Sequence, residues 1–152
     1  MTPAPVSPAT GVLSGRTHVL PLRVYYEDTD AGGIVYHANY LRFAERGRTE
    51  MLRAIGIELG RLRENEGLIF VVRKADMEYY KAAVLDDSLT VETTLEEIRG
   101  ASVVLRQHIF RVGSANVSEE LFNFNVHVAC MGPDGKAARL PNALRDEFEK
   151  LL

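Results

Sequence analysis

Two aspartates stand in a glycine-containing turn directly ahead of the longest helical pattern in the sequence. Asp28 and Asp30 lie in the run EDTDAGG, a cluster of turn formers, and the helical pattern begins at Asn39. The first turn of a helix leaves backbone N–H groups unpaired and carries about half a positive charge, so it favours an ionised carboxylate and can hold an anionic oxygen. A carboxylate beside such donors is suited to attack on an acyl carbonyl. The alternative is that both aspartates only satisfy the backbone of the turn.

Two further side chains could act with Asp30. His37 stands between the turn and the helix, where it offers a backbone N–H and an imidazole to the same substrate. The alternative for His37 is a surface ring packed on a neighbouring tyrosine. Tyr26 precedes the turn and could hydrogen-bond the carboxylate, or it could serve only as an aromatic wall.

Several familiar site motifs are absent from the sequence. It contains no phosphate-binding loop, no dinucleotide-binding fingerprint and no serine elbow. The four histidines lack the spacing of metal ligands, and Cys130 has no partner motif. Asp28, Asp30 and Gly33 match three positions of a calcium loop, but Asn39 stands where that loop needs a bidentate glutamate. We therefore expect no metal and no cofactor.

A long amphipathic helix over residues 39–55 is the first element that must position these groups. Its apolar residues recur at spacings of three and four, and they form one stripe comprising Tyr40, Phe43, Ala44, Gly47, Met51, Ala54 and Ile55. Arg46, Arg48 and Arg53 lie largely off this stripe. A glycine costs about 1 kcal/mol relative to alanine inside a helix. We therefore expect another backbone to approach the helix closely at Gly47, and Gly56 to end it.

The remaining chain predicts strands. We expect strands over residues 18–27, 68–81, 88–98, 102–112 and 120–131, a polar link over 60–67, and a short helix over 141–152. The fifth of these strands alternates most clearly, with Phe122, Phe124, Val126, Val128 and Cys130 facing one way. Strands and helices are segregated along the chain, which predicts an α+β fold with a mainly antiparallel sheet. A long sheet curled around one central helix would fit both the element lengths and Gly47.

Composition bounds the class of protein. The chain has 152 residues, 46% of them hydrophobic, and a formal net charge of −3. This predicts one domain over residues 18–152 and a flexible N-terminal tail over residues 1–17. The acidic balance argues against nucleic-acid binding, and the longest apolar run, residues 68–72, is too short for a membrane span. A single cysteine fits a reducing compartment, so we expect a cytoplasmic protein.

Four segments carry a resemblance to a known family. The stretch RVYYEDTDAGGIVYHANYLRFAERGRTE (residues 23–50) resembles the 4-hydroxybenzoyl-CoA thioesterase family, and more closely its Tol–Pal-associated acyl-CoA thioesterase branch. The runs FVVRK (residues 70–74), EYY (78–80) and RGAS (99–102) are similar to the same branch. The resemblance covers about residues 18–150 and leaves the N-terminal segment outside.

The resemblance implies a hotdog fold, homodimers or homotetramers with sites at the subunit interface, and hydrolysis of acyl-CoA without a metal. The family's catalytic carboxylate corresponds to Asp30, and its carbonyl-polarising backbone N–H falls at His37. The branch also has a histidine side chain at the position of His37 and a tyrosine at that of Tyr26. Asp30 would either attack the thioester carbonyl or activate a water, and both roles stay open.

Substrate-binding residues are carried over less completely. The hydroxybenzoyl branch holds CoA phosphates with a basic cluster, of which only Arg99 is present, so Arg73, Lys74 and Lys81 are further candidates. Glu45 corresponds to the acidic helix residue that addresses the aromatic hydroxyl in that branch. The alternative function is an interaction partner of acyl carrier protein or of lipid-synthesis enzymes. Arg42, Arg46, Arg48 and Arg53 would then supply the basic surface for such a partner.

Overall fold

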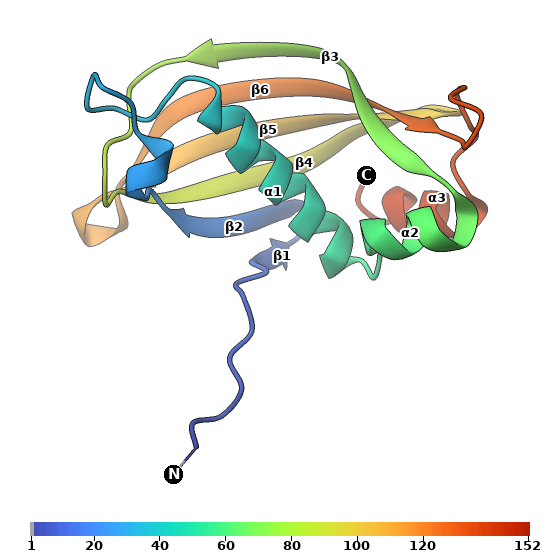
Figure 1. The fold of residues 1–152 in the computed structure, drawn as a ribbon, viewed down its shortest axis with the longest axis horizontal. Helices are drawn as coiled ribbons and strands as arrows, with labels where there is room; N and C mark the ends of the chain where they lie inside the picture. The colour runs from blue at the N-terminus through green and yellow to red at the C-terminus, as the bar shows by residue number, and fades with distance from the viewer. Residues whose placement is uncertain (1) are drawn as a thin grey trace.

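A curved six-stranded antiparallel sheet wraps around one long helix in the computed structural model, which describes residues 2–152 (Figure 1). The elements in chain order are β1 (Val12–Ser14), β2 (Thr17–Arg23), α1 (Asn39–Ala54), α2 (Leu59–Glu66), β3 (Ile69–Tyr79), β4 (Ser88–Ile98), β5 (Ser102–Val112), β6 (Ser118–Met131) and α3 (Asn142–Glu149). Short 3₁₀ turns occupy Tyr26–Asp28 and Ser114–Asn116. The predicted α+β class and the hotdog arrangement are confirmed.

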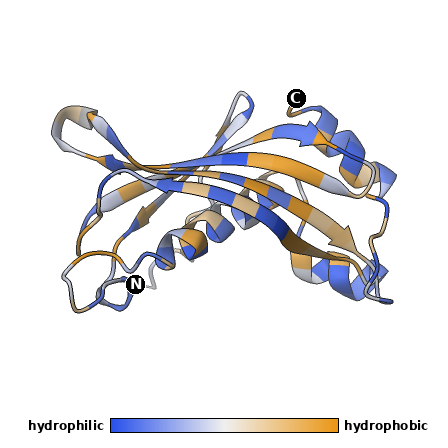
Figure 2. Ribbon diagram, turned by 90° about the horizontal axis from the view of Figure 1, so that it is seen from above, coloured by the Kyte–Doolittle hydropathy of each residue, from blue (hydrophilic) through white to orange (hydrophobic). Residues whose placement is uncertain are grey.

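The strand order is β1-β2-β4-β5-β6-β3, so β1 and β3 form the two edges of the sheet. Residue pairing between β3 and β6 runs from Ile69 opposite Met131 to Tyr79 opposite Phe122. The sheet arches over α1, and α2 and α3 close one end of the fold (Figure 2). This topology brings the end of β3, far along the chain, beside the start of α1.

The core lies between α1 and the concave face of the sheet. The predicted stripe is buried at Tyr40, Phe43, Ala44, Gly47 and Met51, whereas Ala54 is exposed and the neighbouring leucine at position 52 is buried instead. The alternation predicted for β6 is confirmed, because its five inward residues are all buried.

Close packing at Gly47 is confirmed, but the neighbours are side chains rather than the expected backbone. A Cβ at Gly47 would lie 2.7 Å from Val91 Cγ1, 3.0 Å from Thr93 Oγ1 and 3.1 Å from Gln107 Nε2. The strands β4 and β5 thus place their inward side chains against this turn of α1. Glycine is the residue that leaves room for them.

Two element predictions need correction. The strand expected over residues 18–27 ends at Arg23, because the chain turns into the 3₁₀ turn at Tyr26–Asp28. The polar link expected over residues 60–67 is largely the helix α2, which Gly67 ends in a left-handed conformation with φ of 67°. Charged residues dominate α2, so its helical pattern is weak, although Leu59 and Leu62 pack against the core.

Pairing in the sheet begins inside the stretch that we expected to be a tail. Val12–Ser14 pair with residues 17–19 of β2, and the buried His18 ring lies 2.8 Å, by its Nε2, from the Thr10 carbonyl oxygen. Residues 2–10 are exposed. No helix within residues 2–152 is both long and apolar enough to cross a bilayer.

Candidate active site at the start of the central helix

A small hairpin carries Asp30. The Asp30 N–H donates to the Ile34 carbonyl at 3.0 Å, and the Gly33 N–H donates to the Asp30 carbonyl at 3.0 Å. Gly33 has a φ of 80°, which glycine adopts without strain. One carboxylate oxygen of Asp30 accepts the Gly32 N–H at 2.8 Å. The hairpin therefore presents an exposed carboxylate, and the backbone N–H of Gly32 fixes its orientation.

Asp28 anchors this hairpin to the helix. Its buried carboxylate accepts the Tyr25 N–H and the Asn39 side-chain amide, each at 2.8 Å. Its carbonyl accepts the Tyr36 N–H at 2.9 Å. The structural interpretation of the aspartate pair therefore holds for Asp28, which ties the chain before the hairpin to the first residue of α1.

Asp30 and His37 line the same cavity of about 310 Å³, which we call the Asp30 pocket. Its lining residues are Asp30, Ile34, Val35, His37, Tyr40, Tyr79, Tyr80, Lys81 and Ala82. The Tyr79 hydroxyl donates to the His37 carbonyl at 2.7 Å, so β3 fixes the peptide that precedes α1. Within residues 2–152 the His37 N–H has no hydrogen-bond acceptor, which leaves it free for a ligand oxygen.

Two of the three tyrosines that line the pocket, Tyr40 and Tyr79, are kept in the neutral form. Burial raises the pKa of Tyr40 and also that of Tyr79 above the usual tyrosine value. The Tyr40 hydroxyl accepts the Ala83 N–H at 2.9 Å, and the Ala83 carbonyl in turn accepts the Val35 N–H at 2.9 Å. The segment after β3 thus packs on both α1 and the Asp30 hairpin.

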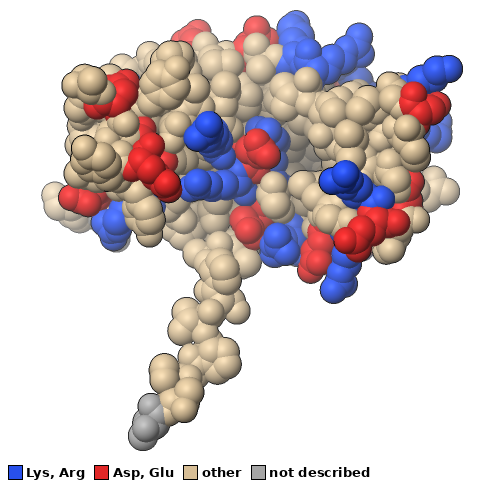
Figure 3. Space-filling model, viewed as in Figure 1, with Lys and Arg blue, Asp and Glu red and all other residues tan. Residues whose placement is uncertain are grey.

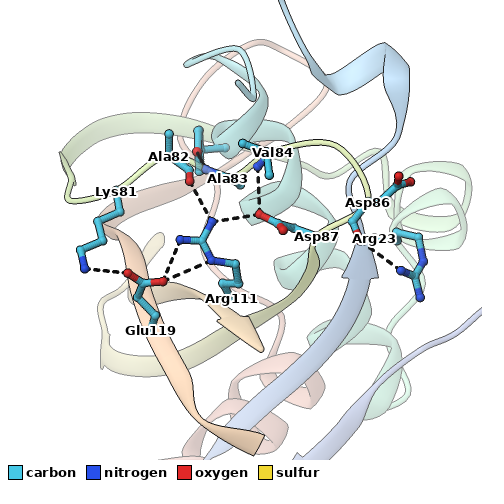
Figure 4. Close-up of polar contacts among 10 residues, drawn as sticks. Arg23, Lys81, Ala82, Ala83, Val84, Asp86, Asp87, Arg111 and Glu119 are labelled. Carbon is cyan, nitrogen blue, oxygen red and sulfur yellow. Dashed lines mark hydrogen bonds and ion pairs between the residues drawn. The ribbon is translucent and has the colours of Figure 1, made fainter. Parts of the chain in front are cut away.

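Arg111 holds that segment in place (Figure 4). Its guanidinium donates to the Ala82 carbonyl and to the Asp87 carboxylate, each at 2.9 Å, and to the Glu119 carboxylate at 2.7 Å. Lys81 also contacts Glu119, at 2.6 Å. Hydrogen bonds to Lys81 and then Arg111 lower the pKa of Glu119, whose carboxylate is thereby kept ionised. The network therefore joins β5 and β6 to Lys81 and Ala82, which line the Asp30 pocket.

Of the other candidate residues, Lys81 lines the Asp30 pocket of the same chain, whereas Tyr26, Arg73, Lys74, Arg99 and Glu45 do not. Tyr26 is 82% exposed and is absent from the pocket lining. Arg73 and Lys74 are exposed at the bulge of β3. Arg99 pairs with Glu97 beyond the opposite end of the sheet.

Glu45 lies elsewhere on α1, where it lines a second cavity and an outer hollow. Arg48, one of the four arginines named for the basic surface of the alternative function, is half-buried and lines that second cavity. Within residues 2–152 no cluster of three or more histidine, cysteine, aspartate or glutamate side chains could hold a metal ion.

Sequence reasoning from single residues missed the tyrosines of the pocket. The sequence pattern predicts Tyr40 only as one apolar position of a helical stripe, and it predicts Tyr79 only as a residue near the end of a strand. Only pairing between β3 and β6 brings Tyr79 to the start of α1. The one available signal was the run EYY at residues 78–80, which belongs to the family resemblance.

Comparisons with known proteins show which family the chain resembles. A profile described as the thioesterase superfamily matches residues 32–118. The chain is 44% identical over 131 residues to the acyl-CoA thioester hydrolase YbgC of Escherichia coli, covering 86% of this chain and 94% of that protein. It is 36% identical over 132 residues to the acyl-CoA thioesterase YbgC of Helicobacter pylori, covering 86% and 96%.

Solved structures show the same fold. The crystal structure of a probable thioesterase from Bartonella henselae is 38% identical, with a TM-score of 0.75, over 82% of this chain and 99% of that one. An aspartate-to-asparagine variant of 4-hydroxybenzoyl CoA thioesterase, solved with 4-hydroxybenzoyl CoA, matches with a TM-score of 0.82 at 20% identity, over 88% and 99% of the two chains. At that identity the second match bears on the fold alone.

Proposed function

Because this chain belongs to the thioesterase superfamily, we propose that it hydrolyses acyl-CoA thioesters at the Asp30 pocket, with Asp30 as the reacting carboxylate. The coarse activity, acyl-CoA thioester hydrolysis, follows from the close relatives over nearly their whole length. The observation that supports the finer proposal is the joint position of Asp30 and His37 in one cavity at the N-terminus of α1.

The pocket suggests a division of labour. The thioester carbonyl oxygen would accept the His37 N–H, close to the positive end of the α1 dipole. One such donor contributes about 10²–10³ in rate. The Tyr79 hydroxyl donates to the His37 carbonyl at 2.7 Å and so restrains the residue whose N–H is the donor.

Asp30 has two chemically complete roles. As a nucleophile, its oxygen bonds to the carbonyl carbon, CoA leaves as a thiolate that takes up a proton, and water then hydrolyses the mixed anhydride. As a general base, Asp30 takes a proton from water while the water oxygen bonds to the carbonyl carbon, and the C–S bond then breaks so that CoA leaves as a thiolate and takes up a proton. Mass spectrometry of rapidly quenched enzyme distinguishes them, because only the first role adds the acyl mass to the chain.

We also propose that a second copy of this chain completes the site, as a homodimer or homotetramer. Tyr80, which lines the Asp30 pocket, is exposed, and so are Tyr25, Tyr26 and Tyr36 in the neighbouring segments of the chain. Arg99 lies too far along the sheet to reach the pocket of its own chain, so it could serve CoA only from another subunit. Arg73, Lys74 and Lys81 are the remaining candidates for the CoA phosphates. A monomer in light scattering that still hydrolyses acyl-CoA would contradict this.

A second candidate function is docking of acyl carrier protein, which is acidic. Arg42, Arg46 and Arg53 are exposed along α1 and could form its surface. A panel of acyl-CoA substrates with free thiol as the readout separates the two functions. Hydrolysis that Asp30→Asn abolishes and Asp146→Asn leaves intact supports the enzyme, since Asp146 is an exposed carboxylate on α3. Negligible hydrolysis with co-purified carrier protein supports the alternative. Cytoplasmic location and Tol–Pal association stay predictions.

A further inference from the structure

A second cavity of about 290 Å³ lies between the C-terminal half of α1 and the β5-β6-β3 side of the sheet. Within the described residues it shares no lining residue with the Asp30 pocket. Leu59 of α2 and Phe148 of α3 close one end, and Phe70, Val103 and Val128 form part of the sheet wall. The cavity is therefore a separate, mainly apolar space.

The lining of this cavity includes one arginine, Arg48. The Arg48 guanidinium donates to the Gln107 side-chain carbonyl at 2.9 Å and lies 5.9 Å from the centre of the Phe124 ring. Gln107 is fully buried, and its amide nitrogen donates to the Ala44 carbonyl at 2.8 Å and to the Thr93 hydroxyl at 2.9 Å. A fixed buried glutamine thus holds Arg48 in one orientation, which makes the arginine part of a built site.

Arg48 keeps unused hydrogen-bonding capacity. A guanidinium has five N–H donors, and only one contact to a protein acceptor, Gln107, occurs within residues 2–152. Burial lowers the pKa of Arg48 and the charge of Glu45 raises it, but an arginine stays charged at neutral pH. Within the described chain no carboxylate oxygen lies within 4.0 Å of the guanidinium. A charge placed among apolar side chains in this way calls for an anionic partner.

The surroundings of the cavity are net positive. Glu45 lines the cavity together with Arg48, and it also lines an outer hollow with Arg42 and Arg46. Glu50, the other acid at this hollow, pairs with Arg53 at 3.1 Å. Among residues 2–152, Glu45 is thus the one acid of this hollow without an ion pair, and three arginines line the two spaces that it borders. The face of the molecule that carries α1 shows basic and acidic side chains interleaved (Figure 3).

We propose that this cavity binds an apolar molecule that ends in a carboxylate, with the carboxylate on Arg48 and the apolar body against the sheet. An apolar cavity of about 150 Å³ accommodates benzene, so one of about 290 Å³ has room for roughly ten non-hydrogen atoms, the size of octanoate. The carboxylate can come from a free acid, which is the product class of thioester hydrolysis, or from the far end of a dicarboxylic acyl group.

Calorimetric titration of the full chain with octanoate, and with the neutral octanamide, tests the charge requirement. We expect octanoate to bind at least tenfold more tightly than octanamide, and Arg48→Met to remove this preference. Arg53→Met is the matched control, because it also removes one positive charge from α1 but lies outside the cavity lining, and it should keep the preference. Equal binding of the two probes by the unmodified chain, or no binding of octanoate, would overturn the proposal.

A second variant covers the case in which Arg48→Met fails to fold. Val128→Phe fills the cavity and leaves Arg48 in place, so it should abolish octanoate binding, and retained binding would contradict the proposal. The source of the carboxylate follows from substrates. If it belongs to the acyl group, that group must span about 16 Å along α1 from His37 to Arg48, so Arg48→Met lowers the ratio of kcat/KM for hexadecanedioyl-CoA to that for palmitoyl-CoA at least tenfold. An unchanged ratio, with octanoate still bound by the unmodified chain, assigns the site to the free acid. Binding is measured without turnover, so the result is independent of the role of Asp30.

Discussion

Asp28 and Asp30 are two residues apart, but Asp28 is a buried structural carboxylate and Asp30 is an exposed one. Replacing each by alanine should therefore change the stability of the fold by different amounts. The Asp28 carboxylate is buried and accepts two hydrogen bonds of 2.8 Å, from the Tyr25 N–H and the Asn39 amide. Hydrogen bonds to a charged group contribute about 1.5–3 kcal/mol each. We take the lower end of this range for each of the two bonds. Asp28→Ala should therefore lower the free energy of unfolding by about 3 kcal/mol.

For a chain of this length, about 3 kcal/mol corresponds to a fall in melting temperature of about 6–12 °C. Asp30→Ala removes one exposed contact from the Gly32 N–H, and it should change the melting temperature by about 2 °C or less. Thermal unfolding followed by circular dichroism measures both. The reasoning is refuted if Asp28→Ala melts within about 2 °C of the unmodified chain, or if Asp30→Ala is the more destabilised variant.

Three further outcomes follow from packing, positioning and charge. Gly47→Ala should lower the urea midpoint, because overpacking costs about 1–3 kcal/mol against about 1 kcal/mol gained in helix propensity, and a raised midpoint would contradict the packing. Tyr79→Phe should lower kcat/KM about three- to tenfold with little change in melting temperature, through loss of one positioning hydrogen bond, and unchanged kinetics would exclude that role. Hydrogen bonds to Lys81 and Arg111 depress the pKa of Glu119, so its contribution to stability is present above about pH 4.3 and is lost as the pH falls through the lower folded value. The gap in melting temperature between the unmodified chain and Glu119→Gln should therefore be widest near neutral pH and close in acid, and a gap constant with pH would refute this.

Periodic patterns in the sequence predicted the elements that are long and half-buried. The strands at Ser88–Ile98 and Ser102–Val112 match their predicted limits, because the first alternates apolar and polar residues over most of its length and the second is rich in β-branched and aromatic residues. The strand β1 has three exposed residues, and α2 has a mostly charged surface. Neither buries a continuous apolar face, so neither leaves a period in the sequence that could reveal it.

The candidate site was predictable only where it is local. Asp30 and His37 lie in one turn ahead of a helix, and a motif of contiguous residues can show that. The contact between Tyr79 and the His37 carbonyl depends on how β3 pairs with β6, which local patterns do not encode. The position of Arg48 off the apolar stripe does not reveal that its guanidinium donates to the buried Gln107, because the helical period does not encode this contact with β5.

Single-turnover thiol release from an acyl-CoA, with enzyme in excess, tests most directly whether Asp30 is the reacting carboxylate. A group that acts as nucleophile or general base contributes about 10²–10⁴ in rate, so Asp30→Asn should release thiol at least about 100-fold more slowly than Asp146→Asn at unchanged melting temperature. Rates for the two variants within about threefold of each other would contradict the account, because the hairpin, the His37 N–H and the Asp30 pocket would then serve some other chemistry.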